Sequence, residues 1–312
     1  MGLNEPSVSN KLKAHVALAI VGSLYGLNYI VAKGIMPDYI GPSGFILYRV
    51  VGATILFWIA HRMFSREKLA KEDVPRVVQC AVFGVAMNQL FFFNGLNLTS
   101  PIHASVIMTV NPILVLLAAS VVLREQITGR KIGGIALGIS GALALILLPL
   151  WFDSSEKGNW AGNPLGDAMI LINAISYALY LVSVKPLMQK YQAITVIKWV
   201  FTYGCVLVLP FGYSQAMQVD WHAMPAEILA GVLFVIVGVT FLVYFLNVYA
   251  MKTVSPTVVS VYIYFQPLLA GFLSIFLGME HINWIKILGA ALIFAGVYLV
   301  STTRVRSLAP PA

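Results

Sequence analysis

Residues 100–145 read SPIHASVIMTVNPILVLLAASVVLREQITGRKIGGIALGISGALAL, and the pattern returns over residues 255–300 as SPTVVSVYIYFQPLLAGFLSIFLGMEHINWIKILGAALIFAGVYLV. The two stretches align at an offset of 155 residues without a gap. Ser-Pro begins both, an amide residue precedes a proline in both, and a glutamate and several glycines fall at matching places. The chain therefore contains an internal repeat, and this repeat decides the fold.

Both stretches are apolar enough to lie in a lipid bilayer. The chain of 312 residues is 59% hydrophobic and 10% charged, whereas a soluble domain carries roughly 25% charged residues. Continuous apolar runs of about 20 residues predict membrane-spanning helices. Ten such segments are expected, at residues 14–36, 43–64, 75–97, 101–123, 130–150, 163–187, 193–214, 225–250, 256–279 and 283–303.

The repeat also covers the first helix of each half. SLYGLNYIVAK (residues 23–33) matches AISYALYLVSVK (residues 174–185) at an offset of 152. Each copy then holds five helices, and because five is odd the copies cross the membrane in opposite directions. We predict an all-α polytopic membrane protein with ten transmembrane helices in two inverted five-helix repeats, residues 1–152 and 153–312. Secondary transporters with this architecture bind substrate near the midplane, between the repeats.

Lysine and arginine are concentrated in alternate loops. Cytoplasmic loops carry such an excess, so both termini are predicted to be cytoplasmic. The net charge of +8 is attributed to these loops rather than to nucleic-acid binding. Lys33 and Lys185, near helix ends, are expected to anchor the chain at the membrane surface.

The prolines at the centres of two apolar segments are candidate markers of the binding site. Pro112 and Pro267 each remove a backbone N–H and kink the helix. Irregular backbone at membrane depth is tolerated where it faces protein or a water-filled cavity. Asn111 and Gln266, beside these prolines, are candidate substrate-binding residues, and His103 lies on the same helical face as Asn111. The alternative is that both kinks are packing bends whose amides cap the freed carbonyls.

Further aromatic and amide residues fall on helix faces that could line one cavity. A site built from them would suit small zwitterions or aromatic solutes, although helix packing or lipid contact is the alternative for each one. These candidates are Tyr25, Asn28, Asn88, Phe92, Asn173, Tyr177, Tyr180, Tyr244, Asn247 and Tyr262.

Arg49 lies about two turns inside the second segment, and ionisable residues at that depth are functional candidates. Its guanidinium could hold a substrate carboxylate or phosphate. The alternatives are snorkelling to the surface or a structural bond to a neighbouring carbonyl. No carboxylate lies at the centre of any predicted span, which disfavours exchange of lipophilic cations and leaves His103 as the candidate proton carrier.

The motifs YGLNYIVAK and GLNLTSPIHASVIMTVNPILVLL, together with the second-half block ending in FLGME, resemble the EamA-type members of the drug/metabolite transporter superfamily. The resemblance covers nearly the whole chain. It implies ten helices in two inverted EamA repeats, export of small metabolites and often of amino acids, and a bacterial inner membrane. One departure concerns Tyr25, because many relatives carry tryptophan there.

Other classes are less well supported. An enzyme would need a catalytic or metal motif, and none is found, so no cofactor and no metal are expected. A receptor or assembly factor would need a sizeable loop or soluble domain. Within transporters, nucleotide sugars, sugar phosphates and organic cations remain alternatives to amino acids. The expected partners are a small-molecule substrate and the bilayer, with a monomer favoured over a dimer because Gly134 and Gly138 suit packing within one chain.

Overall fold

The computed structural model describes residues 8–152, 163–269 and 284–302, and the regular elements within these ranges are helices. Seven helical stretches there are long and apolar enough to cross a membrane, and a shorter apolar helix covers Ile287–Ser301. The seven are Asn10–Ile35, Pro42–Phe64, Lys71–Leu98, His103–Val122, Pro164–Lys190, Ala193–Met217 and Ala226–Ala250. The predicted class, an all-α polytopic membrane protein, is confirmed, while the count of ten spans stays a prediction.

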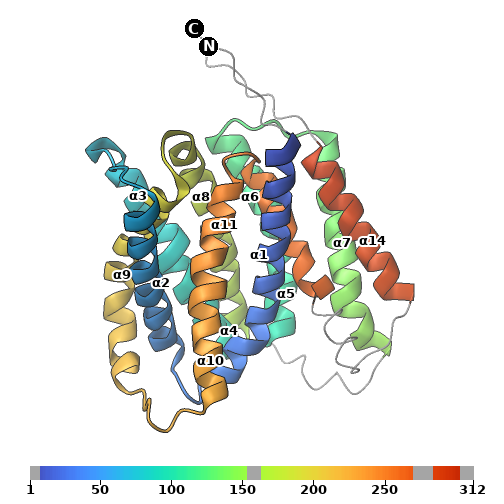
Figure 1. The fold of residues 1–312 in the computed structure, drawn as a ribbon. Coiled ribbons are helices and arrows are strands. Elements are labelled where there is room, and N and C mark those ends of the chain that lie inside the picture. Colours follow the sequence, from blue (N-terminus) through green and yellow to red (C-terminus); the bar gives the residue numbers. More distant parts are fainter. Residues whose placement is uncertain (1–7, 153–162, 270–283, 303–312) are drawn as a thin grey trace.

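The helices follow one another with short connections (Figure 1). The first half contains α1 (Val8–Ile35), α2 (Pro42–Phe64), η1 (Lys71–Asp73), α3 (Val74–Ala81), η2 (Val82–Met87), α4 (Asn88–Leu98), α5 (Pro101–Met108), α6 (Asn111–Val122) and α7 (Gly129–Phe152). The second half contains α8 (Pro164–Lys190), α9 (Ala193–Met217), α10 (Ala226–Phe234), η4 (Val235–Leu242), α11 (Val243–Ala250), α12 (Pro256–Val261), η5 (Tyr262–Tyr264) and α14 (Trp284–Ser301).

The two halves share their local irregularities. A π-helical turn interrupts the third segment at η2 and its counterpart at η4, and such turns are frequent at functional sites. Ser100 caps α5 by accepting a hydrogen bond from the His103 N–H, and Ser255 caps α12 by accepting one from the Val258 N–H. The same sequence signals thus produce the same backbone in both copies.

Several contacts join residues that the repeat makes equivalent. The side-chain amide of Gln89 donates to the Tyr244 hydroxyl at 3.4 Å, and the Tyr264 hydroxyl donates to the Thr109 carbonyl at 3.2 Å. Each pair is separated by 155 residues, the offset of the repeat. Two positions related by a twofold operation touch only near its axis, so these contacts are the kind that the predicted inverted repeat requires.

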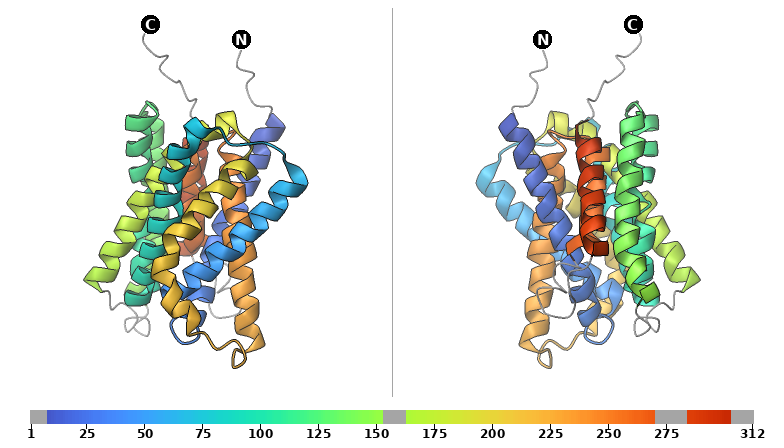
Figure 2. Two further views of the ribbon diagram at one scale, coloured as in Figure 1. Left: turned by 90° about the vertical axis from the view of Figure 1, so that its left-hand side faces the viewer. Right: turned by 90° about the vertical axis from the view of Figure 1, so that its right-hand side faces the viewer.

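Helices α7 and α14 pack closely along one edge of the bundle (Figures 1 and 2). A Cβ atom on Gly134 would lie 2.8 Å from the Gly296 carbonyl oxygen, and one on Gly141 would lie 2.7 Å from that of Gly289. Only glycine permits this approach. The glycine-rich segments therefore pack against each other within the chain, as predicted.

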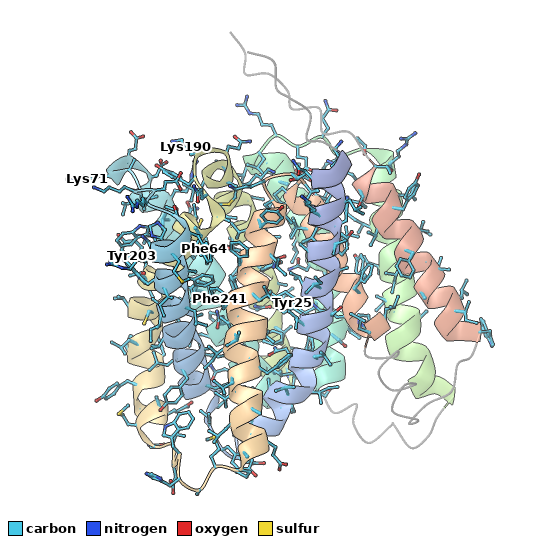
Figure 3. All side chains as sticks on the ribbon, in the orientation of Figure 1. Tyr25, Phe64, Lys71, Lys190, Tyr203 and Phe241 are labelled. Carbon is cyan, nitrogen blue, oxygen red and sulfur yellow. The ribbon has the colours of Figure 1, made fainter. Side chains whose placement is uncertain are left out.

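The first helix of each half is embedded in the other half. Helix α1 packs against α10, η4 and α11, whereas α8 packs against α4, α5 and α6. The start of α1 and the end of α14 lie at one end of the bundle (Figure 1). Lys71 and Lys190 lie at that same end (Figure 3). Its assignment to the cytoplasm stays a prediction.

Candidate substrate site

A pocket lies between the two halves, where both halves contribute helices. It contains about 730 Å³ of space not filled by protein atoms, a volume that includes the open space at its mouth. The lining residues come from α1, α2, α4, α5, α8, α11, α12, η5 and residue Gln266. The predicted residues among them are Tyr25, Asn28, Arg49, Asn88, Phe92, Asn173, Tyr177, Tyr244, Asn247, Tyr262 and Gln266.

The sequence reasoning missed part of the lining. Gln89 follows Asn88, Tyr29 follows Asn28, and Phe93 follows Phe92, so each lies next to a predicted residue. Asn173, from α8, also lines the pocket and was among the predicted candidates. The repeat offset could have identified Gln89, because it aligns with Tyr244.

Three predicted substrate contacts lie outside the pocket lining. Asn111 is fully buried and its amide donates to the Ala174 carbonyl at 3.1 Å, which braces α6 against α8. Tyr180 packs against Gly84 so closely that a Cβ atom there would meet its ring. His103 Nδ1 lies 3.0 Å from an Asp167 carboxylate oxygen. Asn111, Tyr180 and His103 are therefore not part of the candidate substrate site.

The two proline positions coincide with breaks in the helices. Helix α5 ends at Met108 and α6 begins at Asn111, directly before Pro112, while η5 precedes the helical residues 265–269, which include Pro267. Met108, Ile263 and Gln266, at these breaks, line the pocket. The breaks therefore lie at the cavity wall, and Tyr264 binds the Thr109 carbonyl that one break leaves without a helical partner.

Arg49 is the one charged residue among the described residues that line the pocket. Its side chain is 2% exposed, its Nε donates to the Thr240 hydroxyl at 3.0 Å, and its guanidinium lies 4.2 Å from the centroid of the Phe93 ring. Its Nη1 is buried without a hydrogen-bond partner in the described part of the chain. A buried guanidinium with a donor to spare and no carboxylate beside it can bind an anion.

The second half does not supply a matching cation. Phe201 occupies the position equivalent to Arg49, at the offset of 152 that also pairs Gly52 with Gly204. The two halves therefore contribute unequal charge to the pocket, since the cation Arg49 comes from the first half alone among the described lining residues.

Aromatic rings form much of the remaining wall. The Tyr29 and Phe92 rings meet edge to face with centroids 5.5 Å apart, and Phe92 and Phe93 do so at 5.1 Å. Tyr25, from α1, also lines the pocket (labelled in Figure 3). Such walls suit the apolar part of a small solute.

Lys33 and Lys185 cap helix ends rather than serving as surface anchors alone. The Lys33 ammonium donates to the Leu96 carbonyl at 3.0 Å, at the end of α4. Lys185 donates to the carbonyls of Met251 and Val254, after the end of α11. A cation at a helix C-terminus is favourable because the last carbonyls there lack helical partners.

Comparison with known proteins agrees with this architecture. The model of the EamA-like transporter family matches residues 12–147 and again residues 164–302. An uncharacterized transporter of Archaeoglobus fulgidus is 24% identical, with 94% of this chain and 100% of that protein covered. A probable terminal-alkyne amino-acid exporter of Streptantibioticus cattleyicolor is 25% identical over 55% of each chain. One solved crystal structure shares the fold, with a TM-score of 0.71, 16% identity, and coverage of 94% of this chain and 96% of that one.

The chain therefore belongs to the EamA-like transporter family, within the drug/metabolite transporter superfamily. It is a multi-pass membrane protein of a family of transporters.

Proposed function

We propose that this protein is a secondary transporter of the bacterial inner membrane that exports small carboxylate-bearing metabolites, foremost amino acids with apolar or aromatic side chains. The observation that carries the proposal is Arg49, a buried guanidinium with an unpartnered donor in a pocket between the two halves. A substrate carboxylate would supply the missing counter-charge and a charge-assisted hydrogen bond. The amino-acid exporter among the relatives supports the same class of substrate.

The charges around the pocket argue against the two alternative substrate classes. An organic cation would meet Arg49 without an opposing carboxylate in the described lining. A nucleotide sugar carries two phosphate charges and needs clustered cations, yet Lys33 binds the Leu96 carbonyl and Lys198 lies against the Trp58 ring, 4.4 Å from its centroid. One guanidinium fits one carboxylate.

Transport would proceed by alternating access, with one half rocking against the other around the pocket. Two polar contacts are suited to serve as gates. His15, in the first turns of α1, lies 2.7 Å from the Tyr262 hydroxyl, while Asp167, in the first turn of α8, binds Thr99 at 2.6 Å and His103 at 3.0 Å. We assign the first contact to the cytoplasmic side and the second to the outer side, so that they break in turn.

The test is counterflow into proteoliposomes that contain the purified protein. Labelled amino acids, a nucleotide sugar and a lipophilic cation are offered to wild type and to Arg49→Gln. We expect wild type to exchange apolar or aromatic amino acids and Arg49→Gln to lose this exchange. Exchange of the nucleotide sugar or of the cation alone would overturn the proposal.

A further inference from the structure

Four carboxamides in the pocket lining have a buried side-chain oxygen with no hydrogen-bond partner in the described part of the chain. They are Asn28, Gln89, Asn173 and Asn247, and each side chain is 2–3% exposed. Buried polar atoms in native proteins are nearly always paired, so a cluster of unpaired acceptors in one pocket points to a ligand with donors.

Two of these amides are fixed in orientation by their own hydrogen bonds. The Asn173 nitrogen donates to the Asn88 carbonyl at 2.7 Å, and a carbonyl can only accept. The Tyr244 hydroxyl donates to the Gly84 carbonyl at 2.8 Å and accepts from the Gln89 nitrogen. In both cases the nitrogen is held by protein, and the oxygen is left as the acceptor at the pocket.

These oxygens and the guanidinium of Arg49 belong to residues that line the same pocket. Arg49 stacks on Phe93, and Gln89 precedes Phe93 by four residues on the same helical face, about 6 Å along the axis. Asn173 is bound to residue 88, next to Gln89. A ligand with a carboxylate and an ammonium on the same carbon could bridge this separation. Each group would make one hydrogen bond of about 2.9 Å.

We propose that Gln89 and Asn173 bind the ammonium group of the substrate while Arg49 binds its carboxylate, so that the transporter selects α-amino acids over plain carboxylates. This inference rests on the function proposed above and narrows its substrate class. Neutral amide oxygens stabilise the ammonium without adding charge, and the carboxylate balances Arg49. The aromatic wall then receives an uncharged side chain.

The experiment compares three ligands: one with both the ammonium and the carboxylate, and two that each lack one of these groups. Binding of labelled L-phenylalanine to the purified full chain is competed with unlabelled L-phenylalanine, with 3-phenylpropanoate, which lacks the ammonium, and with phenethylamine, which lacks the carboxylate. Wild type should bind either analogue at least about tenfold more weakly, because a hydrogen bond to a charged group is lost. Gln89→Leu and Asn173→Leu should weaken L-phenylalanine by about tenfold and leave 3-phenylpropanoate within about twofold.

The matched control is Asn94→Leu. Asn94 lies on the same helix as Gln89, and its amide bonds to Leu90 and Ser43 rather than lining the pocket. The Asn94→Leu variant should bind the three ligands in the same order of affinity as wild type. Equal wild-type affinity for L-phenylalanine and 3-phenylpropanoate would overturn the ammonium site and leave a carboxylate transporter, a result that holds even if the leucine variants do not fold. Absence of amino-acid binding together with failed counterflow would overturn both proposals.

Discussion

Replacing Arg49 with methionine should weaken substrate binding and leave the stability of the protein nearly unchanged. The variant loses the charge-assisted bond to the substrate carboxylate, about 1.5–3 kcal/mol, which corresponds to roughly 10- to 150-fold weaker binding. In the free protein, the change removes the Thr240 bond, also about 1.5–3 kcal/mol, and a stacked cation worth about 2 kcal/mol. It also removes the several kcal/mol that an unpaired buried ion costs. These contributions nearly cancel, so the free energy of unfolding should stay within about 2 kcal/mol of wild type.

Lys131 provides the contrast, because it is buried with a partner. Its ammonium lies 2.7 Å from a carboxylate oxygen of Glu125, and both side chains are 2–3% exposed. Lys131→Met leaves Glu125 buried and unpaired and should destabilise the protein by about 3–5 kcal/mol. Thermal melts in detergent, with ligand titrations on the same samples, measure both variants. The reasoning would be refuted if Arg49→Met melted as early as Lys131→Met while still binding substrate.

Three further predictions follow from contacts away from the pocket. Gly296→Ala would place a Cβ atom 2.5 Å from the Gly134 carbonyl oxygen and should lower stability by about 1–3 kcal/mol, whereas Gly133→Ala, with no atom within 4 Å of the new Cβ, should be neutral or slightly stabilising in the same melt. Lys185→Met removes the donor to the carbonyls after α11 and should lower the free energy of unfolding by about 1.5–3 kcal/mol for each bond that water does not replace, seen as an earlier thermal melt. Asp167→Asn weakens the contact to His103 outside the pocket, so counterflow should change in rate by about tenfold or more with substrate affinity within about twofold; an affinity change alone would contradict its assignment as a gate.

The internal repeat made most of the fold predictable. Apolar runs long enough to span a bilayer gave the helical class, and the repeated Ser-Pro and amide-Pro pairs correspond to helix caps and breaks in both halves. Arg49 could be singled out because a cation at that depth is unusual, and aromatic and amide residues were conspicuous for the same reason.

Two of the predicted residues that lie outside the pocket lining are found where the helical period is interrupted. Placing His103 and Asn111 on one face assumed a continuous helix, but α5 ends at Met108, so the rotation of α6 is set anew. Gln89 and Phe93 join Asn88 and Phe92 in the lining because positions i, i+1, i+4 and i+5 of α4 lie on one face of the helix. Tyr180 could not be placed from sequence, because its neighbour Gly84 comes from the other half.

The most direct test of the central claim is an experimental structure of the protein with an apolar amino acid bound. The measured quantity is the distance from Arg49 Nη1 to the nearest substrate oxygen. A carboxylate oxygen at about 2.7–2.9 Å from this nitrogen is the predicted result. A substrate bound elsewhere, with Arg49 still held by Thr240 and Phe93 alone, would contradict the account.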